Sequence, residues 1–111
     1  MKFTIPNRKL SKRLLDPTET VKAFGMPIAK RISQRLREFE AAENLEVLRF
    51  FPAANCHELK GQNAGQLSVD ISANYRLIIQ PADDPPPLKE DGGLDWSAVT
   101  EILILDIVDY H

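Results

Sequence analysis

The sequence predicts an α+β domain in which two N-terminal helices pack on one side of a small, twisted, mainly antiparallel sheet. Apolar residues recur at helical spacing up to about residue 42, and they alternate with polar residues in short runs after residue 66. The segments follow the order strand, helices, three strands, without the strand–helix alternation of a parallel sheet. We expect residues 1–111 to form one domain, because a chain of this length buries one modest core.

The N-terminal half is expected to supply a short strand and a short helix before its main helix. Residues 3–5 are apolar enough for the strand, and residues 7–15 carry no decisive pattern. Asp16 is an N-cap carboxylate and Pro17 occupies the first helical position, so a short helix follows. Gly25 is placed to end that helix.

A longer helix is predicted from Pro27 to about Ala42. Its apolar residues share one face at helical spacing: Ile28, Ile32, Leu36 and Phe39. Four basic residues lie off that face: Lys30, Arg31, Arg35 and Arg37. The helix therefore packs on a flat surface and presents a basic outer side.

Three strands are predicted in the C-terminal half. Residues 67–71 alternate between apolar and polar side chains, and residues 74–80 do so again, with Arg76 on the face opposite Tyr75. Residues 99–108 are apolar on both faces, which is typical of an inner strand. The proline-rich and glycine-rich segment before them is expected to be a loop that Trp96 anchors.

Composition excludes several classes of protein. A single cysteine excludes an internal disulfide framework, and no Cys-x-x-Cys pair suggests a metal site, so we expect no cofactor. No apolar run approaches the roughly 18 residues that a membrane span needs. The N-terminus lacks the apolar region and cleavage site of a secretory signal. A cytoplasmic protein is the expectation.

The net charge of −2 hides an asymmetry between the two halves. Residues 1–61 hold 12 Lys or Arg against 7 Asp or Glu, a formal charge of +5. The rest of the chain holds 2 against 9, a formal charge of −7. The basic half can face nucleic acid, or its charges can simply solvate the helices.

Four residues have the chemistry for cleaving RNA without a metal: His57, Lys60, Arg76 and His111. Histidine suits both proton transfers, from the 2′-OH and to the leaving 5′-oxygen. Lysine and arginine stabilise the charge that builds on phosphorus. The structural alternative is a solvated loop histidine, a turn lysine and an arginine that pairs with Asp70.

Two further residues flank the terminal histidine. Asp109 would orient an imidazole, or would simply cap the edge of the sheet. Tyr110 would stack on a nucleobase and position phosphate, or would pack in the core. A Cys56–His57 nucleophile is disfavoured, because neighbours in an extended segment point apart and no third group orients them.

Together, four motifs resemble the RelE/ParE superfamily of bacterial type II toxins, and in particular its HigB-like killer proteins. The resemblance covers about residues 26–111. The motifs are His57-Glu58-Leu59-Lys60-Gly61, Ser68-Val69-Asp70-Ile71, Asn74-Tyr75-Arg76-Leu77 and Val108-Asp109-Tyr110-His111.

The resemblance implies a RelE/ParE-like fold and a ribosome-dependent mRNA endonuclease that inhibits translation. It implies a cognate helix-turn-helix antitoxin as partner, with DNA contacted only through that antitoxin and no membrane involved. His57 and His111 would then transfer protons and Lys60 and Arg76 would stabilise the transition state. Asp109 and Tyr110 would orient the substrate and His111.

Two other functions stay open at this point. A ParE-type toxin of the same fold would inhibit DNA gyrase by binding, without needing the two histidines. An inert interaction domain would use the polar cluster only as a solvated sheet edge. The chain departs from the family at the hairpin tip 72–74, which lacks the frequent Asn-Gly, and in its long acidic loop 81–98.

Overall fold

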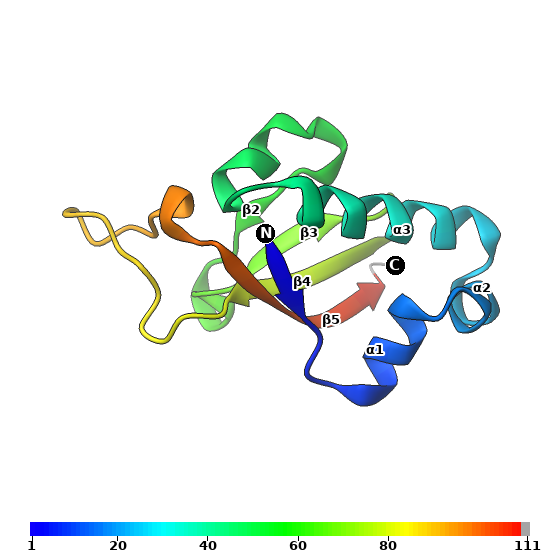
Figure 1. Cartoon of the computed structure of the whole chain (residues 1–111). Helices are drawn as coiled ribbons and strands as arrows, with labels where there is room; N and C mark the ends of the chain where they lie inside the picture. The colour runs from blue at the N-terminus through cyan, green and yellow to red at the C-terminus, as the bar shows by residue number, and fades with distance from the viewer. Residues whose placement is uncertain (110–111) are drawn as a thin grey trace.

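A computed structural model describes residues 1–109, and Tyr110 and His111 lie outside the described residues. Within residues 1–109 five strands form one sheet in the order β1-β5-β4-β3-β2 (Figure 1). The strands are β1 (Lys2–Thr4), β2 (His57–Glu58), β3 (Leu67–Asp70), β4 (Tyr75–Pro81) and β5 (Glu101–Asp109). β1 runs parallel to β5 and the other pairs are antiparallel, so the predicted α+β architecture with a mainly antiparallel sheet is confirmed.

Three α-helices precede β2: α1 (Arg8–Leu15), α2 (Pro17–Phe24) and α3 (Met26–Ala41). The segment without a decisive pattern is therefore helical. Asp16 caps α2 as predicted, because its Oδ1 accepts hydrogen bonds from the backbone N–H groups of Thr18 and Glu19. Gly25 ends α2 at a φ of 82°, a conformation that glycine adopts without steric cost.

The core lies between α3 and one face of the sheet, and Figure 1 shows α3 crossing above the strands. Ile32 and Phe39 are fully buried, as the helical spacing predicts. Arg35 was expected on the basic outer side, and this is wrong, because its side chain is buried. Its Nη1 donates to both Oε atoms of Glu38 at 3.1 Å and its Nε donates to the Asp70 carbonyl oxygen at 2.8 Å. Burial of this charge is possible because both partners satisfy it.

β5 carries an irregularity that the sequence pattern does not reveal. Ile78 of β4 pairs with Asp106, whereas the next residue, Ile79, pairs with Ile104, so Leu105 is an extra residue in β5. Regular alternation would place Asp106 on the same face as Ile104, in the core. The bulge reverses the alternation, so that Asp106 is exposed and Ile107 packs against the core.

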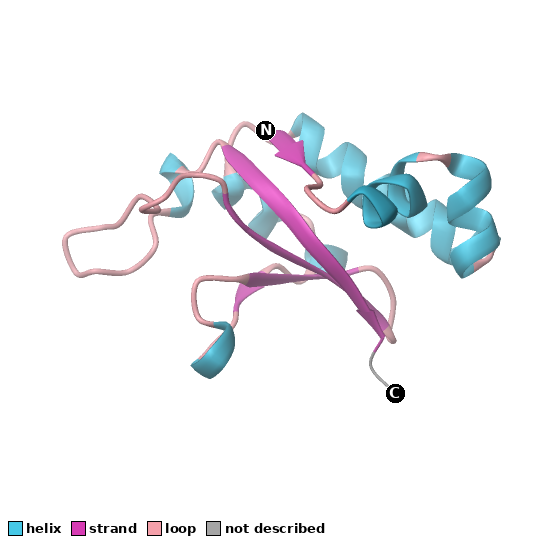
Figure 2. Cartoon of the chain, turned by 90° about the horizontal axis from the view of Figure 1, so that it is seen from below, coloured by secondary structure: helices cyan, strands magenta, loops and turns pink. Residues whose placement is uncertain are grey.

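The loop between β4 and β5 projects from the rest of the molecule (Figures 1 and 2). A short 3₁₀ helix, Trp96–Ala98, ends it, and Trp96 is buried as expected. The indole Nε1 donates to Glu58 at 3.1 Å, and the Arg49 guanidinium lies 3.7 Å from the centre of the indole ring. Trp96 therefore fastens the end of the loop to the segments before and within β2. No helix in residues 1–109 is both long and apolar enough to cross a membrane.

Candidate active site

The face of the sheet that α3 leaves uncovered collects several candidate residues. His57 was expected in a loop, but it lies on the edge strand β2, opposite Ser68 of β3. Ser68 in turn lies opposite Ile78, which lies opposite Asp106. Residues directly opposite one another in antiparallel strands point to the same face. His57 therefore shares a face with Asp106, away from the core.

Arg76 lies on this same face, two residues before Ile78 on β4. From the spacing of strands and residues, its backbone is about 12 Å from that of His57. Both residues therefore lie on the sheet face that α3 leaves uncovered, called the open face below, on strands separated by β3. Arg76 thus lies on the face opposite Tyr75, as predicted, and Tyr75 faces inward and contacts the ring of Phe24.

Asp70, the alternative structural partner that the sequence offered for Arg76, does pair with it. It lies directly opposite Arg76 in the β3–β4 ladder, and its Oδ1 is 3.5 Å from the arginine Nε. The Arg76 and Asp70 side chains are 33% and 27% exposed, respectively. An ion pair of this exposure fixes the direction of the guanidinium but leaves part of it accessible to a ligand.

Asn55 is a residue of this site that the sequence analysis missed. Its Nδ2 donates to Asp70 Oδ2 at 3.2 Å, and its carbonyl oxygen is 2.8 Å from His57 Nδ1. It adopts a left-handed backbone conformation with a φ of 43°. The sequence did hold a signal for it. Asparagine is enriched in the left-handed conformation, and this one follows a short Pro-Ala-Ala run and lies two residues before a histidine.

The remaining candidates lie at two ends of the sheet. Lys60 is exposed and follows β2, at the end of the sheet away from Arg76, with His57 between them along the strand direction. Asp109 ends β5 opposite Tyr75, so its register places it on the face of Tyr75, at the end of the sheet where Arg76 lies. Tyr110 and His111 lie outside the described residues.

A hollow of about 500 Å³ lies on the open face between these ends. Its lining combines apolar, amide and carboxylate side chains from the β2–β3 connection, β4 and β5: Leu59, Asn63, Gln66, Ile78, Leu105, Asp106, Val108 and Asp109. Of the predicted site residues, Asp109 lines it, whereas His57, Lys60 and Arg76 do not. The hollow therefore lies on the same face of the sheet as His57 and Arg76, but the charged side chains that line it are carboxylates.

Cys56, next to His57, points the other way and packs against the core. Burial raises the pKa of its thiol to about 12, since the thiolate is poorly solvated there. The thiol therefore stays protonated at neutral pH, in agreement with the argument against a Cys–His nucleophile. Across residues 1–109 no group of three or more His, Cys, Asp or Glu side chains is arranged to hold a metal ion.

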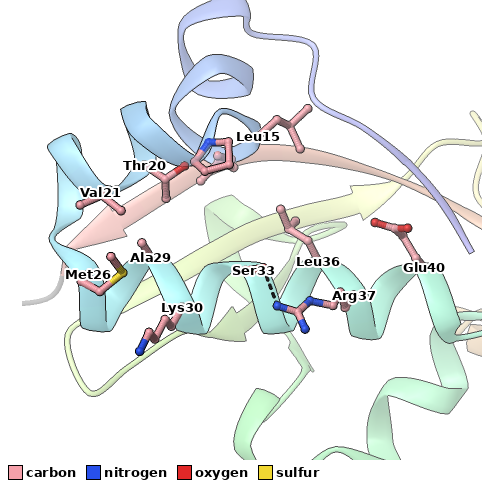
Figure 3. Close-up of a pocket in the computed structure, with 12 residues that line it drawn as sticks. Leu15, Thr20, Val21, Met26, Ala29, Lys30, Ser33, Leu36, Arg37 and Glu40 are labelled. Atoms are coloured by element: carbon pink, nitrogen blue, oxygen red, sulfur yellow. Dashed lines mark hydrogen bonds between the residues drawn. The ribbon is translucent and has the colours of Figure 1, made fainter.

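A second hollow, of about 400 Å³, lies between the α1–α2 turn and α3 (Figure 3). Apolar side chains such as Leu15 and Met26 line it, with Lys30, Arg37 and Glu40 along α3, where Arg37 donates to Ser33 Oγ at 3.0 Å. Of the predicted site residues that the structure describes, none lines this groove. It is therefore separate from the open face of the sheet.

Comparisons with known proteins agree with this architecture. The chain is similar in structure to a YoeB/ParE toxin from Agrobacterium tumefaciens, with a TM-score of 0.55, 14% sequence identity and coverage of 100% of both chains. At that identity the likeness shows the shared fold. A comparison with curated proteins found no match.

A family model described as "RelE-like toxin of type II toxin-antitoxin system HigB" matches residues 7–85, which is most of the chain. The matched span includes His57, Lys60 and Arg76 and ends before β5. Toxins of such systems act together with a cognate antitoxin, so this chain has an antitoxin as its partner. The chain therefore belongs to the HigB-like family of RelE-like toxins of type II toxin–antitoxin systems.

Proposed function

We propose that this toxin cleaves mRNA on the ribosome, without a metal ion, and so inhibits translation. The observation that carries the proposal is that His57 and Arg76 share the sheet face that α3 leaves uncovered. The HigB-like family supports it, since its members are generally mRNA-cleaving enzymes. The proposed active site consists of His57, Lys60, Arg76, Asp109, Tyr110 and His111.

In the proposed reaction the ribose 2′-oxygen attacks the adjacent phosphorus and the 5′-oxygen of the next nucleotide leaves. The products are a 2′,3′-cyclic phosphate and a free 5′-hydroxyl. His57 and His111 take the proton from the 2′-OH and deliver one to the 5′-oxygen, because imidazole both accepts and donates protons near neutral pH. No electron transfer is involved, so no redox partner is needed.

Two cations stabilise the charge that builds on the phosphoryl oxygens. Arg76 donates from a guanidinium that Asp70 already aligns, and Lys60 approaches from the other end of the open face. The RNA then lies across the open face, with a base near the hollow. Asp109 and Tyr110 orient the substrate and His111 in this proposal.

The test is primer extension on a translated mRNA after induction of the toxin without antitoxin. We expect new 5′ ends with wild type, and about 10²-fold fewer with His57→Ala or His111→Ala. A matched control, Lys22→Ala on the exposed side of α2, should cleave like wild type. The same message made untranslatable should stay intact.

Other outcomes would reject the proposal. Inhibited DNA supercoiling with intact translated mRNA would identify a gyrase-binding toxin of the ParE type. Normal growth and intact mRNA on induction would indicate an inert interaction domain. Undiminished cleavage by both histidine variants would reject the assigned residues while keeping the activity.

A further inference from the structure

The backbone of Asn55 constrains the proton on His57. The asparagine carbonyl oxygen lies 2.8 Å from His57 Nδ1. A carbonyl oxygen only accepts hydrogen bonds, so the imidazole must carry a proton on Nδ1 to make this contact. In the neutral ring the lone pair then resides on Nε2, the nitrogen free to accept a proton from a substrate.

The Asn55 side chain holds that carbonyl in place. Its Nδ2 donates to Asp70 Oδ2 at 3.2 Å, which fastens a residue in a left-handed conformation to β3. Asp70 is itself immobilised, because the buried Arg35 donates to its carbonyl oxygen at 2.8 Å. Ala54, the residue before Asn55, is buried in the core, which attaches this segment to the rest of the molecule.

The same carboxylate also aligns the cation. Asp70 Oδ1 lies 3.5 Å from Arg76 Nε, while its Oδ2 receives the Asn55 amide. Asp70 therefore positions both groups through different oxygens. Oδ1 contacts the Arg76 guanidinium directly, and Oδ2 acts on the His57 imidazole through Asn55. Loss of the amide would leave Arg76 aligned and release only the imidazole.

We infer that Asn55 is a positioning residue, which fixes His57 in the Nδ1–H tautomer and at a set distance from Arg76. The inference rests on the proposed function, because it assigns Nε2 of His57 to proton transfer. Asn55 acts through His57 and does not itself touch the reacting atoms. Its removal should therefore alter the imidazole before it alters the fold.

The experiment compares Asn55→Gly with wild type. Glycine adopts the left-handed conformation without strain, so the variant removes the amide and keeps the backbone path accessible. The matched control is Asn7→Gly, which loses a similar bond from the Leu10 N–H to Asn7 Oδ1, of 2.9 Å, at the start of α1. Nitrogen-15 NMR of the imidazoles, at a pH where they are neutral, reports the tautomer, and His57→Gln assigns the signals.

We expect Nδ1 of His57 to be protonated in wild type and in Asn7→Gly. In Asn55→Gly the Nε2–H form should gain population, and cleavage of translated mRNA should slow by about 10-fold. An unprotonated Nδ1 in wild type would overturn the inference. So would an Asn55→Gly variant that cleaves slowly with an unchanged tautomer, or one that matches wild type in both measurements.

A second variant covers the case in which Asn55→Gly does not fold, as judged by its circular dichroism. Asn55→Asp keeps the shape and tolerates the left-handed conformation, but it replaces the donor with a carboxylate that Asp70 repels. It should show the same change of tautomer, and an unchanged tautomer would overturn the inference. If wild type does not cleave mRNA, the proposed function fails, whereas the tautomer measurement still decides whether Asn55 holds His57.

Discussion

Replacing Arg76 with methionine tests whether Arg76 acts on RNA or only neutralises the charge of Asp70. The two side chains are 33% and 27% exposed and 3.5 Å apart, so their ion pair contributes at most about 1 kcal/mol. Asp70 Oδ1 is itself a buried atom, and leaving it without its cation costs about 1–3 kcal/mol more. From this pair alone we expect a loss of about 1–4 kcal/mol, which lowers Tm by about 4–17 °C in a chain of this size.

Cleavage should respond much more strongly than stability. Removing one donor to a charged transition state typically slows a reaction by about 10²–10³-fold. The double variant Arg76→Met/Asp70→Asn removes the orphaned charge, so most of the lost Tm should return. Cleavage should stay low, since the guanidinium is still missing.

The two measurements are thermal unfolding by circular dichroism and quantitative primer extension on translated mRNA. Arg37→Met, which removes an exposed arginine from α3, controls for the loss of positive charge. If cleavage returned together with Tm in the double variant, Arg76 would be structural and the reasoning would be refuted. Wild-type cleavage by the single variant would refute it as well.

Two further predictions concern the scaffold. Trp96→Phe loses the Nε1 hydrogen bond to the Glu58 carboxylate and weakens the contact with Arg49. We therefore expect the free energy of unfolding to fall by about 2 kcal/mol. Urea unfolding should show this as a lower midpoint at an unchanged m-value. Burial raises the pKa of the Cys56 thiol from 9.0 to about 12, so above pH 9 the unfolded chain loses this proton while the folded chain keeps it. The free energy of unfolding should therefore fall by up to about 1.4 kcal/mol per pH unit between pH 9 and 12. In Cys56→Val the decrease of this free energy with pH should be smaller by that amount.

Local signals predicted much of the N-terminal half. The carboxylate of Asp16 caps α2, and the glycine that follows the helix ends it, because both effects depend only on neighbouring residues. The buried face of α3 followed from its spacing for the same reason. α1 was not predicted, although it is a regular helix with buried Leu10 and Leu14. Its two buried residues are too few to distinguish a helix from a loop by spacing alone.

Alternation predicted β3 and β4 and the side of β4 on which Arg76 lies. It could not reveal the bulge at Leu105, because β5 is apolar on both faces and any register satisfies such a pattern. Only pairing with β4 selects the register in which Asp106 leaves the core. β2 was also missed, since two residues form a strand only when a neighbour pairs with them.

The sequence by itself determined the class of fold, the chemistry of the candidate residues and the family they resemble. Each of these depends on residue type and short spacing, which the chain carries locally. The tertiary structure decided which residues meet: it buried Arg35 against Asp70, brought Asn55 to His57, and set Arg76 on the same open face. Such contacts join segments far apart in the chain, and their partners are chosen by packing and strand register, which no local pattern encodes.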